Sequence, residues 1–314
     1  MSGASGIPFL DADAIAAALS PAEAVDALEA ALRGGLDPEA DPPRGALEAE
    51  AGEVLIMPSS APGAVGVKLV TVAPDNPARG RPRIQGVYVL FDPETLAPAA
   101  LLDGIGLTNL RTAAVSALAV RHLAAPDARR LLVFGTGAQA WAHVGALRAV
   151  VAGIERVDVV ARDRERLEAF VARCARAHRL DARVAEPEAV ADADLVVCAT
   201  TAREPLFDGA RVRSTATVVA IGSHEPGARE VDERLAGRAT VVVESCSSAL
   251  REAGDVIAAG EPFAEIGEVV AGTRPGRQSA DEITLFKSVG VAVADVVAAD
   301  LVWRAARHGA GPAV

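Results

Sequence analysis

Hydrophobic and polar residues follow two successive patterns along the chain. In the N-terminal part, apolar residues with helical spacing over 11–33 predict two helices, and short alternating segments predict β-strands at 53–57, 65–72 and 86–91. An Ala/Val/Leu-rich segment over 112–124 predicts a further helix. This part of the chain therefore predicts a domain of helices with an antiparallel or mixed sheet.

From residue 126 the pattern changes to short apolar runs that alternate with helical segments. The runs predict strands at 131–134, 156–161, 194–200, 216–222 and 240–244. Helices are expected between them, notably over 138–151 and 163–179, and again over 265–273. Strands alternating with helices are typical of a doubly wound parallel sheet, so we expect a Rossmann-type α/β domain here. A last helix over 295–307 has the periodicity to pack back onto the N-terminal domain.

The segment 129–140, RRLLVFGTGAQA, contains a candidate binding motif. Its apolar run 131–134 is typical of a parallel strand buried on both faces, and a helical pattern follows directly. Gly135, Gly137 and Ala140 have GxGxxA spacing: the first permits a tight turn, the second lets a pyrophosphate approach the backbone, and the third lets helix and strand pack closely. An ordinary Gly-rich turn is the alternative, but strand, turn and helix together predict a dinucleotide site.

Composition narrows the class of protein. The chain has 314 residues, 51% of them hydrophobic, a net charge of −11 and a pI near 5.0. We therefore expect about two globular domains, and neither nucleic acid nor a membrane surface as the main partner. No apolar run is long enough to span a membrane and no signal peptide is evident, so a cytoplasmic protein is expected. The three cysteines are widely spaced, so no disulfide framework and no metal site are expected.

Three basic residues are candidates for chemistry. Lys68 is one of two lysines in the chain, and apolar residues flank it. It is either a lysine on an edge strand whose ammonium reaches water, or a partly buried lysine. In the second case, burial lowers its pKa, so that it can exchange a proton with a substrate. Arg111 is expected in the first turn of helix 112–124, where the dipole disfavours a cation, so it needs a partner such as a substrate carboxylate. Arg44, in a loop rich in Pro and Asp, could be a solvated loop residue.

The end of the second strand of the Rossmann domain bears on the choice of cofactor. An acidic residue there accepts a hydrogen bond from the ribose 2′-hydroxyl of NAD, whereas the 2′-phosphate of NADP needs a cation. This strand ends at Arg162, with Asp163 one residue later. The sequence therefore favours NADP(H), with NAD(H) as the alternative if Arg162 is only a surface residue and Asp163 the helix N-cap.

With these features, the sequence resembles the ornithine cyclodeaminase/mu-crystallin family from about residue 7 to about residue 307. The resemblance is carried by Met57-Pro58, Gly66-Val67-Lys68, Leu107–Ala114, Phe134–Ala140, Phe286–Gly290 and Asp295. It implies a substrate-binding and dimerisation domain formed by residues 1–125 and completed by 281–314, a Rossmann domain over 126–280, and a homodimer. It further implies chemistry at the α-carbon of small amino or imino acids.

The resemblance also implies roles for single residues. Arg44 and Arg111 would hold the substrate carboxylate, and Lys68 would lie beside the α-carbon and its nitrogen, so that Lys68 and Arg111 are the expected catalytic residues. Met57 and His224 are further substrate-binding candidates. The expected cofactor-binding residues are Thr108, Gly135, Thr136, Gly137, Ala138, Gln139, Arg162, Ala199, Thr200, Ser223 and Ser288.

Two departures from the family pattern concern the reaction. Members that act on ornithine have an acidic residue where Leu55 stands here, although Glu53 lies on the same strand face, and an Asp where His224 stands. His224 is either an ordinary loop residue or a proton donor at the cofactor edge. We therefore expect NAD(P)H-dependent hydride transfer at the α-carbon of a small imino or amino acid, as in a ketimine or pyrroline-2-carboxylate reductase or an amino acid dehydrogenase. Ornithine cyclodeaminase and a nucleotide-binding protein without turnover are the alternatives.

Overall fold

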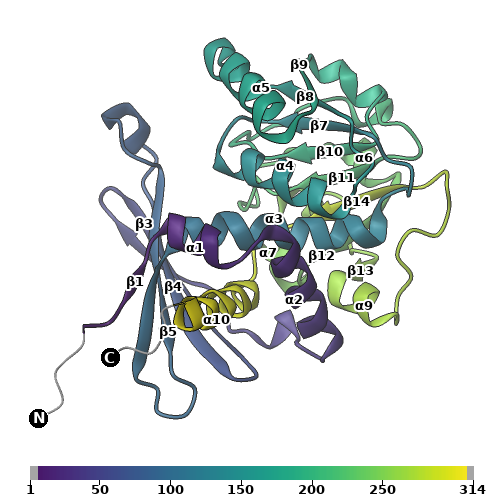
Figure 1. The fold of residues 1–314 in the computed structure, drawn as a ribbon. Helices are drawn as coiled ribbons and strands as arrows, with labels where there is room; N and C mark the ends of the chain where they lie inside the picture. Colours follow the sequence, from purple (N-terminus) through teal and green to yellow (C-terminus); the bar gives the residue numbers. More distant parts are fainter. Residues whose placement is uncertain (1–5, 310–314) are drawn as a thin grey trace, which may run out of the picture. The chain divides into compact units, whose positions relative to one another are not determined.

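The computed structural model describes residues 6–309, which divide into two compact units. The first unit takes in the chain up to Thr112 and from Val291 onward, and the second is Ala113–Gly290 (Figure 1). These divisions differ from the expected ones at 125/126 and 280/281. The first falls within the helix α3 (Gly104–Leu123), and the second follows the strand β14 (Ile283–Lys287), which pairs with strands of the second unit.

A six-stranded sheet of order β1-β6-β5-β4-β3-β2 forms the first unit. Its strands are β1 (Phe9–Leu10), β2 (Gly45–Ala49), β3 (Gly52–Ala61), β4 (Ala64–Val72), β5 (Ile84–Phe91) and β6 (Pro98–Asp103). The pairs from β2 to β6 are antiparallel, and β1 joins β6 in parallel. Along β4 every second side chain is buried, as the period of two requires.

Helices cover one face of this sheet. The helix α10 (Ala292–Gly309) contacts β3, β4 and β5, and both α1 (Ala12–Ala18) and α2 (Pro21–Arg33) contact α10. The sequence places a cap at the start of each N-terminal helix: Asp11 accepts a hydrogen bond from the Ala14 N–H, and Ser20 and Glu23 form a capping box. A 3₁₀ turn at Pro38–Ala40 and another at Asn76–Arg79 complete the unit.

An eight-stranded parallel sheet of order β13-β12-β14-β11-β10-β7-β8-β9 forms the second unit. Besides β14, its strands are β7 (Arg130–Phe134), β8 (Arg156–Val160), β9 (Asp181–Val184), β10 (Leu195–Cys198), β11 (Thr217–Ala220), β12 (Ala239–Val243) and β13 (Ala264–Glu265). Every residue of β10, β11 and β14 is buried, as expected of parallel strands covered on both faces.

The helices of the second unit alternate with these strands. They are α4 (Ala138–Val150), α5 (Arg164–His178), α6 (Glu233–Ala236), α7 (Cys246–Glu252), α8 (Gly254–Ile257) and α9 (Ile266–Ala271), with 3₁₀ turns at Pro187–Ala191 and Gly209–Arg211. The prediction of a Rossmann-type parallel sheet together with a separate α+β sheet is confirmed.

Two helix starts differ from the sequence prediction. Helix α3 begins at Gly104, because the Asp103 carboxylate accepts hydrogen bonds from the N–H groups of Ile105 and Gly106. Arg111 therefore lies beyond the first turn of α3, so the predicted place of Arg111 in a first turn is wrong and the helix dipole does not disfavour its charge there. Helix α10 begins at Ala292, which puts Asp295 in its first turn. Within residues 6–309, no helix has the length and apolarity that a membrane crossing demands.

Candidate functional site

Lys68 lies at the centre of the first unit's sheet. It is on β4, with strands on both sides, opposite Met57 of β3 and Tyr88 of β5. Its side chain belongs to the buried face, and the residue is only 1% exposed. The edge-strand alternative for Lys68 is therefore wrong, since β4 is an interior strand and the ammonium does not reach water.

Asp295 joins Lys68 to Arg111. The Lys68 Nζ lies 2.7 Å from Asp295 Oδ2, and the Arg111 Nε lies 2.9 Å from Asp295 Oδ1. Asp295 is 0% exposed and Arg111 is 4% exposed. Arg111 has the partner that its burial demands, but this partner is a carboxylate of the protein's own α10. Asp295 carries part of the family resemblance, but its role was not predicted from the sequence; a lone carboxylate in the apolar segment 289–299 was the available signal.

The electrostatics of this cluster leave it cationic. Burial and the charge of Arg111 lower the pKa of Lys68 to about 8, while Asp295 acts in the opposite direction and Arg44 adds a smaller lowering effect. A single carboxylate thus faces Lys68 and Arg111. The Nη1 of Arg111 is buried and has no hydrogen-bond partner among the described residues, so it can donate to an anionic ligand.

Arg44 and Met57 lie close to the cluster as well. Arg44 is half-buried and close enough to Lys68 for its charge to act on the ammonium. Met57 is buried and pairs with Lys68 across β3 and β4. Asp41, which the sequence argument did not single out, accepts a hydrogen bond from the Ser59 hydroxyl at 2.7 Å. Burial raises the pKa of Asp41.

The glycine turn of the second unit has the geometry of an anion site. Gly135 follows β7 with φ +108°, and a Cβ on it would overlap the carbonyl oxygen of Ala199. Gly137 is the N-cap of α4 and supplies no side-chain cap, and a Cβ built on it would meet nothing within 4 Å. The first turn of a 13-residue helix is thus uncapped by a side chain and next to open space, as a bound pyrophosphate requires. Thr136, Ala138 and Gln139 complete this turn.

The residues at the end of β8 bear on the nucleotide. Asp163 is the N-cap of α5, where its carboxylate accepts a hydrogen bond from the Arg166 N–H and pairs with the Arg166 side chain. Arg164 pairs with Glu168. Arg162 is exposed and has no ion pair or hydrogen bond among the described residues. The Asp163 carboxylate is therefore occupied at the start of α5, whereas the neighbouring Arg162 is available to pair with an anionic ligand.

The remaining cofactor candidates of the second unit follow the carboxyl ends of its central strands. Ala199 and Thr200 follow β10, Ser223 lies beyond β11, and Ser288 follows β14. The Thr200 hydroxyl donates to Glu230, and the buried Ser223 hydroxyl donates to the Ala228 carbonyl at 2.6 Å. His224 is half-buried beside Ser223. Thr108 is on α3 and belongs to the first unit, with its hydroxyl buried.

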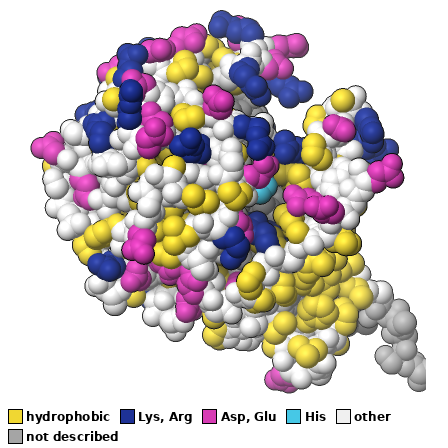
Figure 2. All heavy atoms as spheres, turned by 180° about the vertical axis from the view of Figure 1, so that it is seen from behind, with side chains coloured by type: hydrophobic (Ala, Val, Ile, Leu, Met, Phe, Trp, Pro, Cys, Tyr) yellow, Lys and Arg dark blue, Asp and Glu magenta, His cyan; other side chains and the backbone are white. Residues whose placement is uncertain are grey.

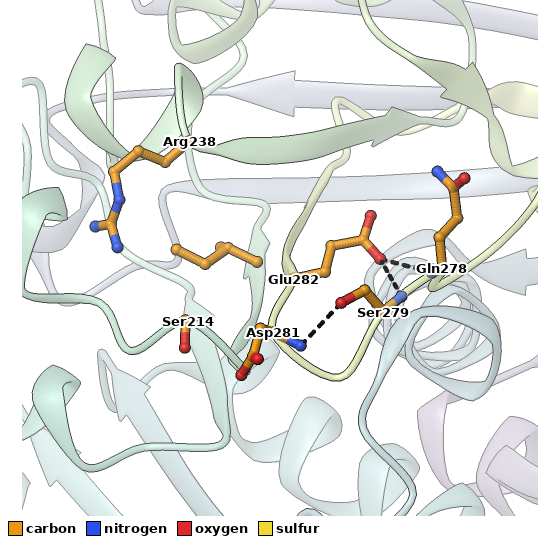
Figure 3. Close-up of a pocket in the computed structure, with 7 residues that line it drawn as sticks. Ser214, Arg238, Gln278, Ser279, Asp281 and Glu282 are labelled. Carbon is orange, nitrogen blue, oxygen red and sulfur yellow. Dashed lines mark hydrogen bonds between the residues drawn. The ribbon is translucent and has the colours of Figure 1, made fainter.

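The second unit also has a shallow depression of about 490 Å³, lined by Ser214, Arg238, Gln278, Ser279, Asp281, Glu282 and Ile283 (Figure 3). It lies where β11, β12 and β14 begin, at the edge of the sheet opposite the glycine turn. Its Glu282 accepts hydrogen bonds from the N–H groups of Gln278 and Ser279, and Arg238 donates to backbone carbonyls. Ligands of open parallel sheets bind at the carboxyl ends, so this depression is not our candidate. Among residues 6–309, no group of three or more His, Cys, Asp and Glu side chains could hold a metal ion.

One unit has a parallel sheet with a glycine turn, and the other has a buried cluster of Lys68 on β4, Arg111 on α3 and Asp295 on α10. This combination is typical of a dinucleotide-dependent enzyme. The chain belongs to the ornithine cyclodeaminase/mu-crystallin family, whose model matches residues 9–310.

Known proteins resemble the chain over most of its length. It is 37% identical to a delta(1)-pyrroline-2-carboxylate reductase of Bacillus cereus over 282 residues, which cover 83% of this chain and 84% of that protein. It is 38% identical to ketimine reductase mu-crystallin of Rattus norvegicus over 253 residues, 79% of each chain. The solved structure of Thermococcus litoralis delta(1)-pyrroline-2-carboxylate reductase, in complex with NADH and L-proline, has a TM-score of 0.92 and 32% identity over 98% of this chain and 100% of that one.

Proposed function

We propose that this protein reduces a small cyclic imino acid, of the kind of pyrroline-2-carboxylate, to the corresponding amino acid. It is an NAD(P)H-dependent oxidoreductase of imino and amino acids. The observation that carries the finer assignment is the buried triad of Lys68, Arg111 and Asp295, in which an ammonium with a lowered pKa lies beside a guanidinium that has an unpartnered N–H group.

The triad suits an α-imino acid, which carries a carboxylate next to a basic nitrogen. The Arg111 Nη1, with Arg44, holds the carboxylate. Lys68 supplies the proton that the nitrogen needs as the C=N bond becomes a C–N bond, and Asp295 keeps the ammonium in place. When bound, the nicotinamide supplies the hydride that adds to the α-carbon. Fixing carboxylate and nitrogen together accounts for much of the acceleration.

The cofactor is a pyridine nucleotide, and we assign NADPH as the preferred one. The glycine turn and the uncapped start of α4 would hold the pyrophosphate. Arg162 would pair with the 2′-phosphate, since Asp163, the acidic group nearest to it, is occupied as the N-cap of α5. Thr200, Ser223 and Ser288 are assigned to the nicotinamide half, with Ala199 and Thr108 as further contacts.

We assign a homodimer as the working assembly. The register of β3, β4 and β5 puts Ile56, Leu69 and Val87 on the face of the sheet opposite to that of Lys68. Ile56 is 40% exposed, and Leu47 of the neighbouring β2 is 60% exposed on the same face. Figure 2 shows hydrophobic side chains gathered over the sheet of the first unit. A second copy of the chain would cover this apolar face.

A cytoplasmic location stays a prediction from the sequence.

The proposed reaction is tested by incubating the protein with NADPH and pyrroline-2-carboxylate. We expect a loss of absorbance at 340 nm and formation of proline. Lys68→Met should lower kcat at least about 100-fold, because it removes the proton donor. The control Arg33→Met removes an exposed cation of α2 and should leave the rate unchanged.

Other results would favour the alternatives. Release of ammonia from ornithine without net change in cofactor would indicate an ornithine cyclodeaminase, with Glu53 acting in place of the carboxylate that Leu55 lacks. Tight NADPH binding without either reaction would indicate a binding protein. Both results would contradict the proposed reduction.

A further inference from the structure

Four charged side chains that are almost fully buried lie in the second unit outside the residues assigned above. They are Glu230, Glu244, Asp255 and Lys287, all no more than 2% exposed. The four are near the carboxyl ends of the parallel strands, where cofactors bind in such sheets. Burying a charge is costly unless it is paired and hydrogen-bonded, so the partners of each group indicate what it is for.

Lys287 and Asp255 form an ion pair. The Lys287 Nζ lies 2.9 Å from Asp255 Oδ2 and donates a hydrogen bond of 2.7 Å to the Ser223 carbonyl. The other Asp255 oxygen accepts from the N–H groups of Glu230 and Val231, at 2.7 and 2.9 Å. The pair therefore fixes the backbone at Ser223, beyond β11, and at Glu230.

Glu230 in turn holds the ends of two neighbouring strands. Its Oε1 accepts from the N–H and the hydroxyl of Thr200, at 2.8 and 2.7 Å, and its Oε2 accepts from the N–H of Gly222 at 2.7 Å. Thr200 follows β10 and Gly222 follows β11. All three partners donate, so the group acts as a carboxylate that accepts on both oxygens. Burial raises the pKa of Glu230, and the charge of Lys287 opposes this effect.

Close backbone contacts extend this network to the glycine turn. A Cβ on Gly222 would overlap the backbone of Thr200, and a Cβ on Gly135 would overlap the carbonyl oxygen of Ala199. The segments that follow β7, β10 and β11 are therefore packed backbone to backbone. A displacement of Thr200 would alter the surroundings of both neighbours.

We propose that Glu230 is a positioning residue for the nicotinamide half of the cofactor: its carboxylate fixes Thr200 and Gly222, and the Lys287–Asp255 pair fixes Glu230 and Ser223. This inference rests on the proposed function, because Thr200 and Ser223 are the residues assigned to that half. Glu244 makes a similar connection to the N–H groups of Val289 and Gly290, next to Ser288.

The test compares two ligands by calorimetry on the full chain. NADPH contains both halves of the cofactor, whereas adenosine 2′,5′-bisphosphate lacks the nicotinamide half. In Glu230→Gln the new amide group donates where a carboxylate oxygen accepted, so at least one strand end loses its bond. We expect NADPH to bind about tenfold more weakly or worse, and the bisphosphate to change by less than about twofold. The KM for NADPH should rise in parallel, while the KM for the imino acid stays within about twofold.

The matched control is Glu233→Gln on α6, three residues away, whose side chain pairs with Arg229 at the surface. It should leave both affinities unchanged. Thermal unfolding reports whether each variant is folded. If Glu230→Gln is unfolded, Glu230→Asp takes its place: it keeps the buried charge but is too short to reach both strand ends, and the same difference between the two ligands is expected.

Three results would overturn the inference. Unchanged NADPH binding in a folded Glu230 variant would show that the carboxylate does not position the cofactor. Equal weakening of both ligands would assign Glu230 to the stability of the whole unit. If the unmodified protein bound neither NADPH nor NADH, the proposed function itself would fail and the inference with it, so the two failures are distinguishable.

Discussion

The protonation of Lys68 depends on its neighbours. Burial and Arg111 lower its pKa to about 8, and Asp295 is the one group of the triad that favours the charged form. At neutral pH the ammonium is therefore mostly protonated but gives up its proton readily, as a proton donor should. Its sequence surroundings identified it as a candidate, since it is one of two lysines and stands in an apolar segment.

This dependence predicts the pH profile of imine reduction. Because the protonated ammonium is the active form, kcat/KM should fall as the pH rises through about 8. In Asp295→Asn, the charge that supports the ammonium is lost, so the fall should move to lower pH by roughly one unit. The rate at pH 7 should drop at least about tenfold as well. The measurement is the pH dependence of kcat/KM from pH 6 to pH 10.

Asp300→Asn is the control for this experiment. Asp300 is on the same helix and pairs with Arg304, and it is not among the charges that shift the pKa of Lys68. The pH profile of kcat/KM of the Asp300→Asn variant should match that of the unmodified protein. A profile of Asp295→Asn that also matched would mean that Asp295 does not govern Lys68.

Arg162 predicts the choice between the two nucleotides. Replacing it with Asp should remove the partner of the 2′-phosphate and repel that group, so the ratio of kcat/KM for NADPH to that for NADH should fall by about 100-fold. The exposed Arg176 in the last turn of α5 serves as the control in Arg176→Asp, which should leave this ratio unchanged. An unmodified protein that used NADH more efficiently than NADPH would refute the assignment.

At the scale of secondary-structure elements, the helices α3 and α4 are joined by a buried polar side chain that the sequence patterns did not identify. His143 of α4 is 0% exposed; its Nε2 lies 2.9 Å from the Ser116 hydroxyl of α3, and its Nδ1 lies 2.8 Å from the Gln139 carbonyl. Burial lowers the pKa of His143 to about 4. This residue thus connects α4, which begins at the glycine turn, to the part of α3 within the second unit.

The connection predicts a loss of stability in acid. In the unfolded chain the imidazole has a pKa near 6.5, above the folded value, so the unfolded state binds more protons between pH 6.5 and pH 4. The contribution of the neutral, buried His143 to the free energy of unfolding is therefore complete above pH 6.5 and is lost as the pH falls toward 4. Between pH 7 and pH 5 it should amount to about 2 kcal/mol of unfolding free energy.

Urea unfolding at both pH values measures this effect. Relative to the unmodified protein, His143→Gln should lose about 2 kcal/mol less between pH 7 and pH 5, because glutamine does not titrate. The exposed His308 of α10 offers the control His308→Gln. Equal losses in all three proteins would contradict the assignment of the acid sensitivity to His143.

For the whole molecule, the apolar outer face of the first unit's sheet predicts the assembly. One chain has a mass of 32.1 kDa, so light scattering after gel filtration should give about twice that value for the unmodified protein. Ile56→Lys puts a charge on this face and should shift the mass toward that of one chain at micromolar concentration. Leu250→Lys, at an exposed apolar position of α7, should stay dimeric. A single-chain mass for the unmodified protein would contradict the prediction.

The sequence was sufficient for features that depend on local order. Strand and helix periods and the GxGxxA turn after an apolar strand follow from neighbours along the chain. Lys68 could be identified as a candidate because a lysine in an apolar segment is unusual, whereas the roles of Arg44 and Arg111 at the substrate carboxylate were implied by the family resemblance. The two-residue edge strand β1 was missed, since so few residues carry no periodic signal, and the strands β6, β9 and β14 were not predicted either.

Only the tertiary structure decided which charges meet. Asp295 is 227 residues from Lys68 along the chain, and Lys287 is separated from Asp255 by a helix and a strand, so no local pattern could pair them. The burial that lowers the pKa of Lys68 arises from its place on an interior strand under α10. Pairing and desolvation depend on distance through space, and therefore the chemistry of the site was fixed by folding.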